Sequence, residues 1–388
     1  MKKSSVKKLA VLLLSALIFA FTACDDNGSN DGDQGNPGAA NEDIMSLPPM
    51  KDKFSAKFMM GNIFNPSDVS GSSVTNTRLT RHFNVLTAEN NMKPQYISTG
   101  PSSFNSTNLD TADRMVNAAR ASGFEVVGHT LLWHSQNAGW MTPTNCTLPN
   151  MKTYITAVVD HFKGRIYSWD VLNEAFPDSG LTINSDWKTS MRSNNPWFTS
   201  QGYNFVYQGF LAARLADPDA ILYYNDYNLD NSVKATMVRN MVRDVNETYL
   251  ASNDKPTEED AERLLIEGIG MQSHHNTNVQ ASSIRNSLNM FKQLGVKISI
   301  SELDVLAQGY SSALEGVGKS PAAGNNLTLQ ATKYRDFMKV FLEFSDIIER
   351  VSLWGITDDK SWRSAGQPLL FDKDGKAKPA YYSFVGAL

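Results

Sequence analysis

The stretch Tyr167-Ser168-Trp169-Asp170-Val171-Leu172-Asn173-Glu174 decides the fold. Its apolar run, 166–172, predicts a buried strand that stops at an amide and a carboxylate. A charged group directly behind a buried run needs a partner or a function. The stretch Ile298-Ser299-Ile300-Ser301-Glu302-Leu303-Asp304 has the same form, so a second strand also delivers a carboxylate at its end.

Short apolar runs of the same kind predict eight strands in all, at 57–63, 84–88, 125–132, 166–172, 220–224, 266–271, 297–300 and 351–356. Helical patterns lie between them, at 110–122, 151–162, 283–294 and 329–348. Eight strand-helix units in about 340 residues predict an α/β fold, a single (β/α)8 TIM barrel with loop insertions. A doubly wound open sheet is the alternative, but it requires a Gly-rich phosphate turn after the first strand, and Gly61-Asn62-Ile63-Phe64 does not supply one.

The composition excludes two classes of protein. The chain has 388 residues, with 40 acidic and 36 basic side chains and a net charge of -4. Nucleic-acid binding draws on clustered Lys and Arg, so we expect no nucleic-acid partner. Two cysteines, Cys24 and Cys146, cannot form a disulfide framework that would hold such a chain together.

Residues 1–23 are typical of a lipoprotein signal peptide. Four lysines precede an apolar run, Leu9 to Ala23, that is too short to span a bilayer comfortably. The end of the run, Phe21-Thr22-Ala23-Cys24, resembles a bacterial lipobox, so we expect Cys24 to be the lipidated first residue of the mature chain. Ordinary secretion with an incidental cysteine is the alternative.

Residues 24–50 predict a disordered acidic tether, because they offer almost nothing to bury, and 51–388 predict the barrel. Acidic residues directly behind a lipidated cysteine resemble the export signal of surface lipoproteins in Bacteroidetes-type bacteria, although a solvated spacer would look the same. We therefore expect a secreted lipoprotein of the outer membrane, on the cell surface, that touches the membrane only through the lipid on Cys24.

Polar residues gather where the predicted strands end, which is where barrels of this kind build their sites. In chain order they are Glu89, Asn90, Lys93, His129, Trp133, His134, Gln136, Asn173, Glu174, Asn225, Asp226, Tyr227, Gln272, His274, His275, Glu302, Asp304, Trp354 and Trp362.

Glu174 and Glu302 would lie across the barrel mouth from one another. Such a pair suits the cleavage of a glycosidic bond, in which one carboxylic acid protonates the leaving oxygen and the other attacks the anomeric carbon or activates water. The alternative for either Glu alone is a structural ion pair.

Tryptophans and histidines refine this prediction. Trp133, Trp140, Trp354 and Trp362 could stack on sugar rings or belong to the core. The histidines lack the spacing of familiar metal sites, since His129 and His134 are five apart and His274 and His275 are adjacent, so we expect no metal and no other cofactor.

Seven motifs in order then resemble glycoside hydrolase family 10, the endo-1,4-β-xylanases, from about 54 to 388. They are Glu89-Asn90-Asn91-Met92-Lys93-Pro94, Gly128-His129-Thr130-Leu131-Leu132-Trp133-His134, 169–175, Tyr224-Asn225-Asp226-Tyr227-Asn228, Gln272-Ser273-His274, Ile300-Ser301-Glu302-Leu303-Asp304 and Leu353-Trp354-Gly355.

The resemblance implies retaining hydrolysis of xylan and xylo-oligosaccharides, and we expect a monomer without a cofactor. Glu174 matches the family's acid/base, which must start protonated, and Glu302 its nucleophile, which must start ionised. His274 and Asp304 match the pair that supports the nucleophile, and Asn173 the residue that holds the sugar 2-hydroxyl. Substrate-binding roles are implied for Glu89, Asn90, Lys93, His129, Trp133, Gln136, Gln272, Trp354 and Trp362 before the cut, and for Tyr227 beyond it.

Two other classes remain open. A lipoprotein that only binds xylan on an inactive barrel would be indicated by a lost carboxylate, and both are present. A metal-dependent barrel hydrolase would lose its activity in EDTA.

Overall fold

The structure is a computed structural model that describes residues 41–258, 261–310 and 324–388, and these belong to one compact unit. The predicted signal peptide, Cys24 and the first part of the predicted tether lie outside the described residues.

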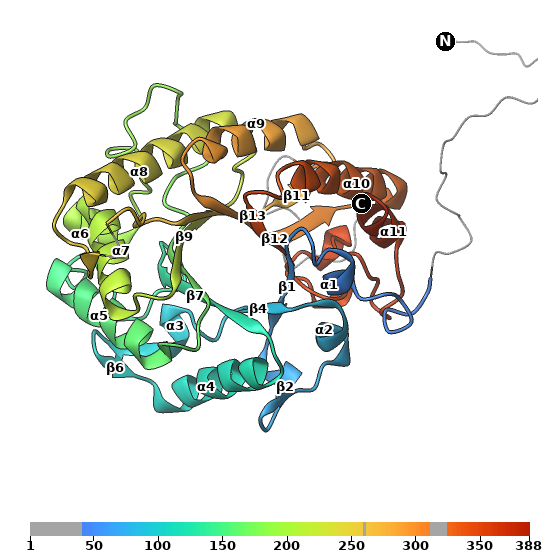
Figure 1. Ribbon diagram of the computed structural model, residues 1–388, viewed down its shortest axis with the longest axis horizontal. Helices are drawn as coiled ribbons and strands as arrows, with labels where there is room; N and C mark the ends of the chain where they lie inside the picture. Colours follow the sequence, from blue (N-terminus) through green and yellow to red (C-terminus); the bar gives the residue numbers. More distant parts are fainter. Residues whose placement is uncertain (1–40, 259–260, 311–323) are drawn as a thin grey trace, which may run out of the picture. The chain divides into compact units, whose positions relative to one another are not determined.

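Eight parallel strands close into a barrel, and they run in the order β1 (Met59–Phe64), β4 (Val85–Ala88), β7 (Glu125–Leu132), β8 (Ser168–Asn173), β9 (Ile221–Asp226), β10 (Gly268–Met271), β12 (Lys297–Leu306) and β13 (Ile348–Leu353). β13 pairs with β1 and completes the ring. Figure 1 looks into this ring, with the helices around its outside. The predicted (β/α)8 barrel is confirmed.

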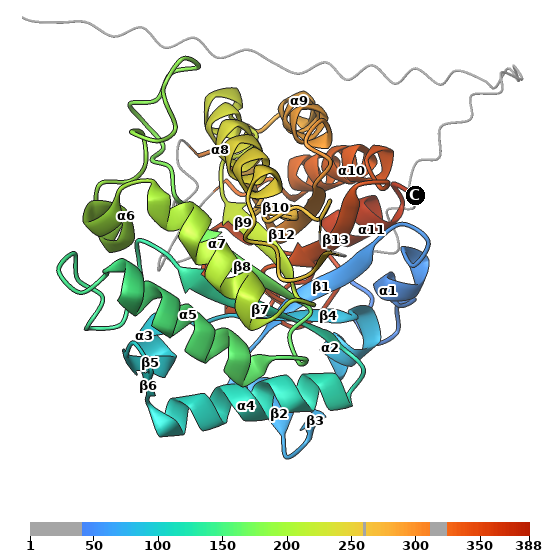
Figure 2. The same cartoon turned by 60° about the vertical axis from the view of Figure 1, so that its left-hand side comes forward.

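Helices connect consecutive strands and cover the barrel. They are α2 (Thr77–His82), α4 (Ser106–Ala121), α5 (Leu148–Phe162), α7 (Asn204–Ala216), α8 (Ser232–Ala251), α9 (Ala281–Lys292) and α10 (Leu327–Glu343), and α11 (Pro379–Val385) follows the last strand. Figure 2 shows α4, α5, α7 and α8 running beside the strands on one side. Asparagine N-caps begin several of them, because the Asn side chain accepts backbone N–H groups that the first turn leaves unpaired, as at Asn105, Asn231 and Asn326.

Short elements complete the fold. They are α1 (Met50–Lys53), α3 (Pro94–Ile97), α6 (Pro196–Gln201), the hairpins β2 (Val69–Ser70) with β3 (Ser73–Val74) and β5 (Ser98–Gly100) with β6 (Ser103–Phe104), and β11 (His274–Asn276), which adds to β12. Within the described part of the chain, no helix is both long and apolar enough to cross a membrane.

The last strand begins three residues before its predicted start. The residues that the prediction missed include charged side chains with partners inside the barrel. Arg350 is almost fully buried, donates to the Ser168 hydroxyl at 3.1 Å and lies 3.9 Å from an Asp170 oxygen, both on the opposite side of the ring. Glu349 accepts from the Tyr223 hydroxyl at 2.7 Å. A prediction based on apolar runs therefore could not find the start of this strand, because buried polar side chains occur there.

Residues 41–50 differ from the predicted disordered tether. Ile44, Leu47 and Met50 are buried in the core, and the Ile44 N–H donates to the Gly375 carbonyl at 3.0 Å. The Arg81 guanidinium donates to the Leu47 carbonyl at 2.7 and 2.9 Å. Three apolar side chains spaced three apart are enough to fix this segment, and the fold begins before the predicted boundary at residue 51.

Candidate active site

A cleft of about 590 Å³ opens at the carboxyl ends of the barrel strands. Its lining includes all of the predicted site residues except Asp304 and Cys24: Glu89, Asn90, Lys93, His129, Trp133, Gln136, Asn173, Glu174, Tyr227, Gln272, His274, Glu302, Trp354 and Trp362. Asp304 lies directly behind His274, and Cys24 lies outside the described residues. His134, Ser135, Asp178 and Arg192 complete the lining.

Glu302 is a buried carboxylate that is held at both oxygens. It lies on β12 with 5% of its surface exposed, accepts from the Asn225 amide at 2.8 Å and lies 3.0 Å from His274 Nε2. Burial raises the pKa of Glu302, but hydrogen bonding to His274 and the His274 charge outweigh that effect and lower it below its ordinary value. This carboxyl group is therefore held in its ionised form.

Asp304 keeps His274 charged. It accepts from His274 Nδ1 at 2.9 Å, and its other oxygen pairs with the buried Arg363 guanidinium. Burial lowers the pKa of His274, but the Asp304 charge more than compensates, and the pKa rises to about 9. At neutral pH His274 is an imidazolium between two carboxylates, which stabilises the anion on Glu302.

The Asn225 amide is oriented from behind. Its oxygen accepts from the Ser301 hydroxyl at 2.6 Å, which directs its NH2 group to Glu302. Gly270 leaves room for it, because a Cβ there would lie 2.2 Å from the Asn225 oxygen. Sequence reasoning placed Asn225 at a strand end but gave it no role, since nothing in the sequence shows which amide faces a carboxylate.

Glu174 is placed by its backbone. It follows β8 with φ +54°, a left-handed conformation that is uncommon for a residue other than glycine. Its N–H donates to the Asn225 carbonyl at 2.8 Å, and the N–H of Ala175 donates to the Tyr224 hydroxyl at 3.0 Å. Tyr224 in turn donates to the buried Asp226 at 2.5 Å. This chain of bonds turns the Glu174 side chain into the cleft.

Amide and indole donors hold the Glu174 carboxyl group. Trp133 Nε1 donates to one oxygen at 2.9 Å, while Gln272 and Asn173 donate to the other at 3.0 and 3.2 Å. The Asn225 amide also donates to the Asn173 oxygen at 3.0 Å. One network of side-chain amides therefore links the two carboxyl groups across the mouth.

His134 is a neutral neighbour of Glu174. Its Nδ1 lies 3.8 Å from a Glu174 oxygen, and burial lowers the pKa of His134 to about 4, with the Arg192 charge acting in the same direction. Glu174 thus lacks the imidazolium partner that Glu302 has.

A polar end of the cleft surrounds Lys93. Its ammonium donates to the oxygens of Asn90 at 3.0 Å and Gln136 at 2.9 Å, and Asn65 donates to Glu89 at 2.7 Å. Burial lowers the pKa of Lys93, although the carboxylates of Glu302, Glu89 and Glu174 oppose that effect. These groups can hydrogen-bond sugar hydroxyls.

The opposite end of the cleft is built around Tyr227. Its hydroxyl donates to Asp178 and accepts from Arg192 at 2.6 Å, while the Lys234 ammonium lies 3.9 Å from the ring centroid. Asp178 and Arg192 were not predicted from the sequence as site residues, because both come from the loop between β8 and α6, which has no periodic pattern.

The tryptophans divide into two groups. Trp133, Trp354 and Trp362 line the cleft, and Trp362 Nε1 donates to Asp304 at 3.2 Å. Trp140 does not reach it: its indole donates to the Ser98 hydroxyl at 2.8 Å and packs edge-on against Trp197. Of the two roles open for Trp140, packing is the one that the structure gives it.

The described residues hold no group of three or more His, Cys, Asp or Glu side chains placed to bind a metal ion. The cleft presents carboxyl groups, amides, imidazoles, aromatic faces, the Lys93 ammonium and the Arg192 guanidinium.

A closed parallel barrel with two supported carboxyl groups at its carboxyl-terminal mouth defines the class of (β/α)8 glycoside hydrolases. The family profile described as glycosyl hydrolase family 10 matches residues 49–387. The chain belongs to this family.

Curated relatives and solved structures agree. The endo-1,4-β-xylanase of Geobacillus stearothermophilus is 32% identical, over 88% of this chain and 98% of that protein. Endo-1,4-β-xylanase A of Thermotoga maritima is also 32% identical, over 87% of this chain, but the match spans only 31% of that longer protein. A solved GH10 xylanase from termite gut that contains a bacterial Ig-like domain is 52% identical with TM-score 0.81, covering 90% of this chain and 79% of that one.

Proposed function

We propose that this chain is an endo-1,4-β-xylanase that cuts xylan and xylo-oligosaccharides with retention of anomeric configuration. The observation that carries the proposal is the unequal support of two carboxyl groups in one cleft: Glu302 is held ionised by His274, while Glu174 is held by neutral donors. The names of the family relatives supply the substrate.

In the first step the Glu302 carboxylate attacks the anomeric carbon while Glu174 gives its proton to the leaving oxygen. The C–O bond to the leaving sugar breaks, and an ester to Glu302 forms. Asn173, already fixed by Asn225 and Gln272, is placed to hold the 2-hydroxyl, a contact that strengthens in the oxocarbenium-like transition state.

In the second step Glu174, now a carboxylate, takes a proton from water, and that water attacks the anomeric carbon from the face the first sugar left. The ester bond breaks, Glu302 returns to its ionised state, and a β-configured product leaves. His274 remains protonated throughout and balances the charge that returns to Glu302.

Anomer-resolved NMR on linear β-1,4-xylan tests the proposal. We expect β-anomers of short xylo-oligosaccharides in the first minutes. Products that appear first as α-anomers would contradict retention, and binding of xylan without any cleavage would contradict the activity. Activity that survives EDTA separates this reaction from metal-dependent hydrolysis.

The proposal extends to the anchor. We propose a monomeric lipoprotein on the outer membrane at the cell surface. The lipobox-like sequence before Cys24 supports the anchor, and the acidic residues behind it support the location. Incorporation of labelled fatty acid that is lost in Cys24→Ser, together with xylan cleavage by intact cells, is the expected result; label in Cys24→Ser would contradict it.

A further inference from the structure

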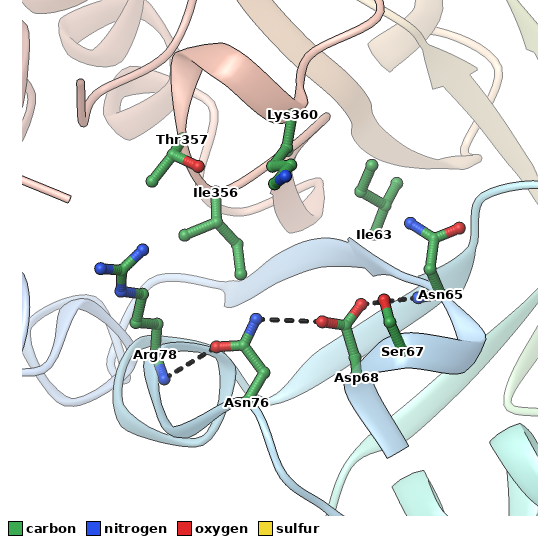
Figure 3. A pocket seen from close by; sticks show the side chains of 10 residues that line it. Ile63, Asn65, Ser67, Asp68, Asn76, Arg78, Ile356, Thr357 and Lys360 are labelled. Carbon is green, nitrogen blue, oxygen red and sulfur yellow. Dashed lines mark hydrogen bonds between the residues drawn. The ribbon is translucent and has the colours of Figure 1, made fainter. Parts of the chain in front are cut away.

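A second pocket, of about 240 Å³, is drawn in Figure 3. Three segments far apart in the chain form it: the loop after β1 (Asn65, Ser67 and Asp68), the start of α2 (Asn76 and Arg78) and the loop after β13 (Gly355, Ile356, Thr357 and Lys360). Ile63 and Ile356 are its apolar lining residues, and Figure 3 shows them at separate places around it.

The polar wall is fixed before any ligand arrives. Asp68 accepts from the Asn65 N–H at 2.8 Å and from the Asn76 amide at 3.0 Å, and the Asn76 oxygen accepts from the Arg78 N–H at 3.1 Å. Asp68 thus has both carboxylate oxygens engaged by N–H donors. Figure 3 shows this row of bonds along one wall of the pocket.

The two cations of this pocket are weakly engaged. The Arg78 guanidinium makes one 3.4 Å contact with the Asp374 carbonyl, and the Lys360 ammonium lies 3.4 Å from Asp359 with 79% of its side chain exposed. Two cations and one carboxylate line this pocket, and that carboxylate, Asp68, already accepts from two N–H groups. This pocket therefore offers two cations to an anionic ligand.

One residue joins the cavities. Asn65 lines the second pocket, and its amide donates to Glu89, which lines the catalytic cleft, at 2.7 Å. Gly355, also in the pocket, directly follows the cleft residue Trp354, and its carbonyl accepts from Asn62 at 3.1 Å. A sugar chain in the cleft at Glu89 thus lies next to the second pocket.

We propose that this pocket binds a uronic acid residue carried by the polysaccharide chain. The isoleucines offer an apolar surface to the sugar ring, the asparagines can reach its hydroxyls, and Arg78 with Lys360 would pair with its carboxylate. The inference rests on the proposed function, because it takes the ligand to be a branch of the substrate. It adds a preference for acidic branches, which the two catalytic carboxyl groups do not provide.

Binding measurements test the proposal in Glu302→Ala, a variant expected to bind without cutting. The probes are xylo-oligosaccharides with a glucuronic acid branch and the same oligosaccharides after reduction of the carboxyl group to an alcohol. Reduction removes the charge and retains the sugar. We expect calorimetry to show that the acidic form binds about three- to tenfold more tightly, with the ratio falling as salt is raised.

Added to this background, Lys360→Gln should lower the ratio and Arg78→Met should bring it close to one. Lys360 is exposed, so its variant should fold even if Arg78→Met does not. Lys339→Gln, an exposed lysine on α10 outside both cavities, is the matched control and should leave the ratio unchanged.

A ratio near one in the Glu302→Ala parent would overturn the proposal, as would a ratio that survives both pocket substitutions. Its failure is distinct from failure of the proposed function. If the wild-type chain leaves linear xylan uncut while the binding ratio persists, the proposed xylanase activity is overturned. The proposal that the second pocket binds a uronic acid would then still stand.

Discussion

Glu302 and Glu174 end two strands of one barrel, yet the protein holds them in different ways. The Glu302 side chain is 6% exposed, and side chains support it: a charged histidine and an amide, each oriented by a further residue. The Glu174 side chain is 12% exposed, and a left-handed backbone places it among neutral donors. The comparison teaches that a nucleophile needs a fixed charge, whereas a proton donor needs a fixed position.

Removal of either carboxyl group should have the largest effect on activity and should show how the two roles differ. Glu302→Ala should lower kcat/KM on xylan by about 10⁴-fold or more, and no choice of leaving group should restore it. Glu174→Ala should also be severely impaired on xylan. With a dinitrophenyl xyloside, whose leaving group needs no proton, it should still form the ester to Glu302, and azide should release a β-xylosyl azide. Equal formation of β-xylosyl azide by both variants, measured by absorbance and NMR, would contradict the assignment of roles.

Asp304→Asn should act on the Glu302 side alone. Without the Asp304 charge the pKa of His274 falls, His274 loses its proton at neutral pH, and the pKa of Glu302 rises. We expect kcat/KM to fall about a hundredfold at neutral pH, with the acid limb of the pH profile moved to higher pH.

Asp230→Asn is the matched control for that substitution. Asp230 lies 3.9 Å from His275, a buried histidine outside the lining of the cleft. Its acid limb should coincide with that of the wild type, and a shift as large as in Asp304→Asn would remove the special role of His274.

Tyr224→Phe should act on the Glu174 side. It deletes the hydroxyl that accepts from the Ala175 N–H and donates to Asp226, so the turn that carries Glu174 loosens. We expect kcat to fall about tenfold or somewhat more with KM little changed, because the loss is one of orientation.

Tyr154→Phe provides the comparison for that variant. The Tyr154 hydroxyl is buried and has no hydrogen-bond partner among the described residues, so its removal should change neither kcat nor stability appreciably. Parallel losses in both variants, measured by steady-state kinetics and urea unfolding, would show that Tyr224 acts only through packing.

The smallest expected effect is on the pH dependence of folding stability. The pKa of His274 is raised from 6.5 to about 9 in the folded state, so its contribution is complete below about pH 6.5 and is lost as the pH rises through 9. The pKa values of Glu302 and Asp304 are lowered, so their contribution is lost as the pH falls below their ordinary values near 4. We expect urea unfolding to show a fall in stability between pH 6.5 and 9 that is smaller in His274→Gln; an equal fall in both would contradict it.

Much of the frame was predictable from the sequence. The run 125–132 predicted β7 with the bounds that the structure has, because most of its residues are apolar or small. The run 297–300 predicted only the start of β12, which continues to Leu306 because it also pairs with β11. The start of β13 was missed because polar side chains fill the barrel interior at Arg350.

The candidate site was predictable where polar residues end strands. Fourteen predicted residues line one cleft, because the barrel brings all strand ends to one mouth. Supporting contacts were not predictable, because the hydrogen bonds of Tyr224 and Ser301 depend on side-chain directions that are set only when the barrel closes. Asp178 and Arg192 come from a long loop whose sequence has no period, and Arg78 and Lys360 meet across segments far apart in the chain.

The packed segment 41–50 brings the start of the described fold next to its end. Asn41 donates to the Ala377 carbonyl at 3.1 Å, and Tyr382 donates to Glu42 at 3.2 Å, so the two ends of the folded polypeptide touch. A short peptide could join them, and new termini could be cut in an exposed turn such as the one at Gly71. Such a permuted chain would keep every strand neighbour and would place its termini on another face of the barrel.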